Sequence, residues 1–276
     1  MTGPATEAYA HDNDHDNGGS VAPHEALTSL LDPLSRWRIT GLLDLTGARC
    51  LVIGAGAGSV AAWLADRVGP DGSVRTMDTG PRLIPDHPRP YPPRPDLVAS
   101  LPPGETYDLV HARLLLNQLP QRRRVLQRLA EAVALGGVLL TEDFWPTPPH
   151  EIVAHAQTEE DAALLRRFHL THLRILAEHG NDRSWSRRAL LAFMEEGFTE
   201  VQAVTYGATW SGGGPGCRLL DAGAGQLEEE LLAAGLTDEE LDRVHVLLGD
   251  PSLVLHGHLL YSTSGRRLST EDGERE

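Results

Sequence analysis

Apolar residues recur along this chain in short runs that alternate with longer amphipathic segments. The run Cys50–Ile53 ends in glycines at alternate positions, and Val60–Ala65 then follows with the spacing of a helix. A second apolar stretch, Val74–Met77, stops at the acid Asp78. The order of strand, glycine turn, helix, strand and acid predicts an α/β unit built on a parallel sheet.

The same patterns predict the rest of the architecture, a doubly wound, Rossmann-like α/β sheet of seven strands with a helical lid. Gly197 is expected to end a helix, and Thr237 is expected to begin one as its N-cap. The other expected elements are two N-terminal helices within 24–45, helices over 121–134 and 190–196, a strand over 199–206, a loop over 212–216, helices within 217–248 and a last strand over 253–262.

The expected domain boundaries follow the changes in composition along the chain. The polar first 20 residues have no apolar segment of the kind found in secretory signals. Their histidines and aspartates are potential metal ligands, but a disordered tail is the simpler interpretation. The predicted parts are a disordered tail 1–20, N-terminal helices 21–46, an α/β core 47–149, a helical lid insertion 150–187, a C-terminal part of the sheet 188–268 and a disordered tail 269–276.

The glycine turn after the first strand carries the clearest chemical signal. Glycines let the backbone approach a ligand closely, and the N-terminus of the following helix favours anions. An acid at the end of the second strand, here Asp78, accepts hydrogen bonds from both hydroxyls of a ribose. A dinucleotide fingerprint would need glycine at position 59, where the chain has Ser59. These features predict a nucleoside-containing cofactor other than NAD.

The spacing Gly-x-Gly-x-Gly resembles motif I of class I S-adenosylmethionine-dependent methyltransferases. Tyr107–Arg113 resembles the fourth strand of that family, and Leu135–Leu140 resembles its Gly-Gly strand element. Glu142–Phe144 and Ser264–Arg267 resemble an actinobacterial-style subgroup of small-molecule enzymes. The resemblance implies S-adenosyl-L-methionine as cofactor and S-adenosyl-L-homocysteine as product. It implies cofactor contacts from Gly54, Ala55, Gly56, Gly58, Asp78, Thr79, Asp96, Leu97 and His111.

Three departures from the family pattern keep a second function open. Val52 stands where the family usually has an acid, and Gln118 stands where the subgroup tends to have histidine. Five prolines interrupt the expected third strand over 87–95, where proline cannot donate to a strand ladder. The alternative is a methyltransferase-like enzyme that catalyses a cyclisation or an isomerisation. A non-catalytic dimeric binding protein is a third interpretation.

Composition narrows the range of partners. The 276 residues suit one α/β domain with additions, and the net charge of −15 disfavours nucleic acid and membrane phospholipid as substrates. No apolar run reaches the length of a membrane span. Two cysteines are too few for a disulfide framework, which favours a cytoplasmic setting. We expect a small-molecule substrate, and a homodimer stays open.

Candidate catalytic groups lie on the helix expected within the insertion. His169, His172 and His179 share one largely apolar face at helical spacing. Histidine accepts protons near neutral pH, so His172 and His169 are candidate bases for a hydroxyl acceptor. The alternatives are packing residues or a dimer contact, and no third ligand is identifiable for a metal. Further candidates near the site are Glu142, Asp143, Tyr206, Trp37, Trp145 and Trp210.

The sequence therefore predicts an S-adenosylmethionine-dependent methyltransferase. The expected acceptor is a small molecule of specialised metabolism, methylated on oxygen by in-line transfer. No metal is expected.

Overall fold

The computed structural model describes residues 21–54, 58–77 and 104–268. Contacts divide the chain into two compact units. The sheet unit comprises Asp32–Trp145, Asp182–Tyr206 and Leu260–Glu276, and the helical unit comprises Met1–Leu31, Pro146–Asn181 and Gly207–Leu259. The predicted tails 1–20 and 269–276 lie outside the described residues.

The sheet unit is built on six described strands in the order β2-β1-β3-β4-β9-β6. β1, β2, β3 and β4 run parallel, whereas β6 and β9 pair antiparallel. Their bounds are β2 Ser73–Met77, β1 Arg49–Ile53, β3 Tyr107–Arg113, β4 Val133–Trp145, β9 Leu259–Arg267 and β6 Phe198–Tyr206. The expected third strand over 87–95 lies outside the described residues.

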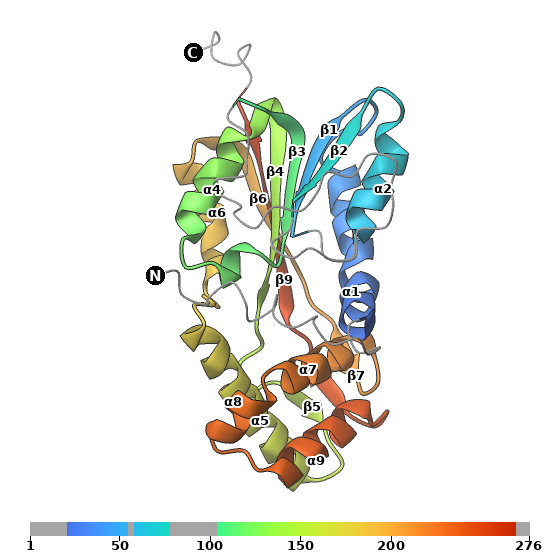
Figure 1. Ribbon diagram of the computed structural model, residues 1–276, viewed down its shortest axis with the longest axis vertical. Helices are drawn as coiled ribbons and strands as arrows, with labels where there is room; N and C mark the ends of the chain where they lie inside the picture. The colour runs from blue at the N-terminus through green and yellow to red at the C-terminus, as the bar shows by residue number, and fades with distance from the viewer. Residues whose placement is uncertain (1–20, 55–57, 78–103, 269–276) are drawn as a thin grey trace. The chain divides into compact units, whose positions relative to one another are not determined.

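Helices cover both faces of this sheet. Figure 1 shows α4 (Arg122–Glu131) and α6 (Trp185–Glu195) on one face and α2 (Ser59–Val68) on the other. The central strands are therefore apolar at successive positions, because both of their faces are buried. One core holds Leu51, Ile53, Val110, Leu139, Leu129 and Phe193, and the opposite core holds Cys50, Val52, Leu64, Leu109, Val138 and Leu140. The predicted doubly wound α/β fold is confirmed.

The N-terminal helices differ from the prediction. A single helix, α1 (Val21–Thr40), replaces the two that were expected, and it continues through Pro33. Proline removes one helical hydrogen bond. The second half of α1 offsets that loss through tertiary contacts, because Ser35 and Arg38 bond to side chains of the sheet.

The helical unit has its own core and a small antiparallel sheet in the order β5-β8-β7. The apolar face of α5, which includes Leu165 and Phe168, shares that core with Leu220 and Val244. Residues 150–181 of the predicted insertion therefore pack together with residues 207–259, whereas residues 182–187 belong to the sheet unit. The role of the insertion as a lid stays a prediction. The elements are β5 Val153–His155, β7 Thr209–Ser211, β8 Val254–His256, α5 Glu159–Glu178, α7 Pro215–Gln226, α8 Glu228–Ala233 and α9 Asp238–Gly249.

Two local predictions are confirmed and one is wrong. Gly197 follows α6 with φ +81°, and Thr237 forms a capping box at the start of α9. The single last strand over 253–262 is two strands, β8 and β9, separated at Gly257. A Cβ atom at Gly257 would lie 2.4 Å from the carbonyl oxygen of Ala208, so the backbone is too crowded there for any side chain.

Candidate functional site

The glycine turn lies at the carboxyl end of β1, where open α/β sheets bind their ligands. Gly54 has φ +69°, and a Cβ atom there would lie 3.0 Å from the carbonyl oxygen of Arg113. Gly58 has φ +75° and is the N-cap of α2. Both positions therefore require glycine in the observed backbone. Ala55 and Gly56 lie outside the described residues.

The first turn of α2 offers backbone donors at this edge of the sheet. No side chain caps the helix among the residues that the structure describes. The first N–H groups of a helix have no partner within the helix, and its dipole places partial positive charge there. This helix start is thus suited to oxygen atoms of a ligand.

A row of aligned residues crosses the carboxyl half of the sheet. Val52 on β1 is in register with Thr76 on β2 and with His111 on β3. The Thr76 Oγ1 and His111 Nδ1 atoms are buried, and neither has a hydrogen-bond partner in the described part of the chain. Buried polar atoms are normally paired, so two such atoms on either side of Val52 indicate a ligand-binding role.

Glu142 on β4 organises a buried polar cluster beside this row. It accepts hydrogen bonds from Ser35 Oγ (2.5 Å) and Ser262 Oγ (3.0 Å), and His111 Nε2 lies 3.0 Å from its Oε2. Arg113 Nη1 donates to Ser35 Oγ at 3.2 Å. Burial acts to raise the pKa of Glu142, but the hydrogen bonds from His111 and Ser35 outweigh it and hold that pKa below its usual range.

This cluster determines which nitrogen of His111 accepts a hydrogen bond. An ionised carboxylate has no proton to donate, so Nε2 carries the hydrogen that points to Glu142. In the neutral ring Nδ1 is then a hydrogen-bond acceptor. The neutral form of His111, predicted as a cofactor contact, thus has a buried acceptor atom on a residue in register with Val52.

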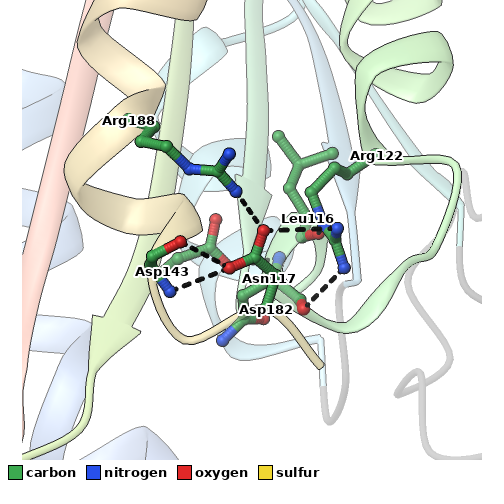
Figure 2. Close-up of polar contacts among 7 residues, drawn as sticks. Leu116, Asn117, Arg122, Asp143, Asp182 and Arg188 are labelled. Atoms are coloured by element: carbon green, nitrogen blue, oxygen red, sulfur yellow. Dashed lines mark hydrogen bonds and ion pairs between the residues drawn. The ribbon is translucent and has the colours of Figure 1, made fainter. Parts of the chain in front are cut away.

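A second polar cluster surrounds Asn117 in the turn after β3 (Figure 2). The Asn117 N–H donates to Asp143 Oδ1 at 3.4 Å, and the Asn117 carbonyl accepts from the Asp182 N–H at 2.7 Å. Arg122 and Arg188 both pair with the Asp182 carboxylate. Burial raises the pKa of Asp143 to about 7.

The predicted catalytic histidines lie in the core of the helical unit. His169 Nε2 bonds to the carbonyl oxygen of Thr147 at 2.9 Å, and the ring of His172 stacks on Phe168. Burial lowers the pKa of His172 to about 3, and both its ring nitrogens lack a hydrogen-bond partner among the described residues. A group with this pKa is a weak base at neutral pH, so the geometry favours the packing alternative over a base.

The remaining predictions divide between described and undescribed residues. Asp78, Thr79, Asp96 and Leu97 lie outside the described residues, so their cofactor contacts stay predictions. Tyr206 contacts Trp37 edge to face, whereas Trp210 is buried beside His258 in the helical unit. His179 pairs with Glu230 at 2.8 Å rather than joining His172.

Sequence reasoning missed Thr76, Ser35 and Asn117. Thr76 belongs to a stretch that was interpreted as a plain apolar strand, yet a hydroxyl inside a strand buried on both faces is itself a signal. Ser35 and Asn117 carry no comparable signal, because their partners are 107 and 26 residues away in the chain.

Two general features complete the description of the site. Among the described residues, no group of three or more histidines, cysteines or acids is arranged to hold a metal ion. No helix in the described ranges is both long and apolar enough to cross a membrane.

A family model described as a methyltransferase domain matches residues 24–203. The chain belongs to this family. The match includes the glycine turn, His111 and Glu142. The predicted membership of the methyltransferase family is thereby confirmed.

Two similar proteins come from the fungus Strobilurus tenacellus. Methyltransferase str2 is 37% identical to this methyltransferase over 100 residues, and methyltransferase str3 is 38% identical over 101 residues. Each match covers 35% of this chain and 35% of the relative. The shared segment is thus about a third of each protein.

Solved structures share the fold at low sequence identity. A putative methyltransferase from Bacillus halodurans has a TM-score of 0.52 at 14% identity, covering 86% of this chain and 100% of its own. The YcgJ protein from Bacillus subtilis has a TM-score of 0.52 at 16% identity, covering 89% of this chain and 99% of its own. Both of these similarities support the Rossmann-like fold and nothing more specific.

The described residues fit the cofactor of the family. Gly54 leaves no room for a side chain at the turn, and α2 begins without a side-chain cap among the described residues. Thr76 Oγ1 and His111 Nδ1 add two buried polar atoms at the same edge of the sheet. A nucleoside with an amino-acid tail has the hydroxyl, ammonium and carboxylate groups that such atoms bind.

Proposed function

We propose that this methyltransferase methylates an oxygen atom of a small-molecule acceptor, a specialised metabolite. The observation that carries the proposal is the row Thr76–Val52–His111 beside the glycine turn. Two buried, unpartnered polar atoms there support a site that holds a polar small molecule. The net charge of −15 supports the exclusion of nucleic acid as acceptor.

The chain's own residues supply binding and orientation. We assign Gly54, Gly58 and the first turn of α2 to the cofactor's amino-acid end, together with His111 Nδ1. The undescribed part of the turn, Ala55 and Gly56, belongs to the same contact. The ribose contacts are assigned to Asp78 and Thr79, and the adenine contacts to Asp96 and Leu97.

When bound, S-adenosylmethionine supplies a methyl group on a positively charged sulfur, which an acceptor oxygen attacks in line. The protein holds the two reactants in that alignment, and positioning of this kind accounts for much of the rate. Transfer to a hydroxyl leaves S-adenosylhomocysteine, the methyl ether and one proton. His172 is not assigned as the proton acceptor, because its pKa of about 3 makes it a weak base.

Calorimetry and product mass together test this function. We expect S-adenosylmethionine and S-adenosylhomocysteine to bind at micromolar concentration. Asp78→Ala should weaken binding by about tenfold or more through lost hydrogen bonds to the ribose. Asp71→Ala is the matched control, because Asp71 is exposed at the opposite end of β2. Unchanged affinity in Asp78→Ala would overturn the ribose assignment.

Turnover with hydroxylated small molecules should add one methyl group to the mass of the product. A product of unchanged mass would favour the alternative, a cyclisation or isomerisation on the same fold. Methylated product and S-adenosylhomocysteine in equal amounts would support the proposal.

A further inference from the structure

The turn that follows β3, Leu114–Gln118, has a strained backbone. Leu114 has φ +50°, which is uncommon for a residue other than glycine. Its N–H donates to the carbonyl oxygen of Glu142 at 2.7 Å, and Gln118 Nε2 donates to its carbonyl at 2.6 Å. Strained backbone of this kind persists only where surrounding contacts hold it.

Asp143 holds this turn from inside the sheet unit. Its buried carboxylate accepts the Asn117 N–H, and the Leu115 N–H also stabilises its ionised form. Asp143 thus ties main-chain donors of the turn to β4. The Leu114 N–H bonds to the same strand, at the carbonyl oxygen of Glu142.

The Arg122 side chain and the Asp182 main chain hold the outside of the turn (Figure 2). Arg122 Nε donates to the carbonyl oxygen of Leu116 at 3.1 Å, and its Nη2 donates to that of Asn117 at 3.4 Å. The Asp182 N–H donates to the same Asn117 carbonyl. These partners are backbone groups and an arginine, so Asp143 is the group in this set that changes charge near neutral pH.

The turn abuts the cofactor's glycine turn. A Cβ atom on Gly54 would lie 3.0 Å from the carbonyl oxygen of Arg113 and 3.8 Å from the Cβ of Leu115. Packing at this distance transmits small displacements, because protein interiors have little spare volume. A shift of Leu115 therefore reaches the backbone that binds the cofactor.

The charges that face Asp143 come from three elements. Burial and the charge of Glu142 on the same strand raise its pKa, Arg122 on α4 lowers it, and the net result is a pKa of about 7. Asp182 and Arg188, at the start of α6, face the same turn through Asn117.

We propose that Asp143 is a positioning residue, whose ionised carboxylate fixes the turn Leu114–Gln118 against Gly54 and thereby sets the affinity for the cofactor. The inference rests on the cofactor assignment made above. Protonation of Asp143 weakens the hold on the Asn117 N–H, so the cofactor binds more tightly above neutral pH than below it. By linkage, binding of the cofactor releases protons from Asp143.

The test is the affinity for S-adenosylhomocysteine, measured by calorimetry from pH 6 to pH 8. In the natural protein we expect the affinity to rise by about fivefold across this range, a typical size for coupled equilibria. Asp143→Asn keeps the size of the side chain but cannot ionise, so its affinity should not change with pH. A pH profile in Asp143→Asn equal to that of the natural protein would overturn the proposal.

Asp108→Asn is the matched control. The Asp108 carboxylate also accepts a backbone N–H, that of Arg49 at 2.8 Å, but near the amino end of β3. Its pH profile should follow the natural protein. All three proteins keep the same histidines, so a difference between profiles reports Asp143. Absence of binding in all three at every pH would instead refute the cofactor assignment.

Proton release gives a second readout that needs no variant. Near pH 7 the binding enthalpy of the natural protein should differ between two buffers of different ionisation enthalpy, because protons pass to the buffer. Equal enthalpies in both buffers would contradict the proposal even if Asp143→Asn failed to fold.

Discussion

His111 Nε2 lies 3.0 Å from Glu142 Oε2, and the two side chains are 1% and 0% exposed. Because Glu142 also accepts from Ser35 and Ser262, it binds α1, β3 and β9 to one carboxylate. With Nε2 bound to Glu142, the other ring nitrogen of His111, Nδ1, is buried and has no hydrogen-bond partner among the described residues. One buried acid thus links three elements of the sheet unit and also binds His111, which we propose as a cofactor contact.

Replacing this acid should lower stability and affinity together. In Glu142→Gln we expect a loss of about 2 kcal/mol in the free energy of unfolding at pH 7, the size of a hydrogen bond to a charged group. Folding depresses the pKa of Glu142 below its ordinary value of 4.5, so its contribution is present above that pH and is lost as the pH falls through the folded value. Urea unfolding at pH 7 and pH 3.5 measures the loss of stability and its dependence on pH, and calorimetry measures the affinity for S-adenosylhomocysteine. A variant as stable as the natural protein at pH 7 would refute this account.

Gly54→Ala should damage the cofactor site through the backbone. We expect a loss of about 2 kcal/mol in stability from the positive φ and the contact with Arg113, and an affinity for S-adenosylhomocysteine lower by about tenfold. Gly47→Ala is the control, since Gly47 has φ +73° but no atom within 4 Å of an added Cβ. Calorimetry should find normal affinity in Gly47→Ala. Equal losses of affinity in both variants would contradict a specific role for Gly54.

The buried His172 should make the protein sensitive to acid. Burial lowers the pKa of His172 from 6.5 to about 3. Between these two pH values the unfolded chain is protonated at His172 and the folded chain is not, so the free energy of unfolding falls as the pH drops from 6.5 toward 3. His172→Phe should remove up to about 1.4 kcal/mol per pH unit of that slope.

The same variant tests the predicted base. Methyl transfer per folded molecule should be unchanged in His172→Phe if the side chain serves packing, and a large loss of kcat would restore it as a base. His150→Ala provides the surface control, because His150 is exposed in the helical unit. Stability curves measured by denaturant at several pH values test the predicted slope, and kcat per folded molecule separates packing from a role as base.

The capping box of α9 offers a test confined to the helical unit. Thr237 Oγ1 accepts a hydrogen bond from the Glu240 N–H at 3.2 Å, and Glu240 Oε2 accepts one from the Thr237 N–H at 3.1 Å. Thr237→Ala should lower the free energy of unfolding by about 1 kcal/mol, whereas Thr237→Ser should keep most of it. Chemical denaturation of the two variants would show equal stability if the cap contributed nothing.

The sequence by itself determined the local elements whose residues are neighbours in the chain. Glycines at 54 and 58, an apolar strand before them and a helical spacing after them predict the strand β1 and the helix α2 that the structure contains. Thr237 and Gly197 mark helix ends through contacts that span only a few residues. Such short-range signals are readable from spacing because the partners are close in the chain.

Only the tertiary structure decided which polar groups share a site and what charge they carry. Ser35 and Glu142 are 107 residues apart, and no spacing rule brings them together. Folding gave opposite properties to adjacent acids: hydrogen-bond donors lower the pKa of Glu142 despite its burial, whereas burial raises that of Asp143 to about 7. It also made His172 a weak base, although its residue type favoured catalysis. A pKa depends on desolvation and on neighbouring dipoles, which exist only after the chain has folded.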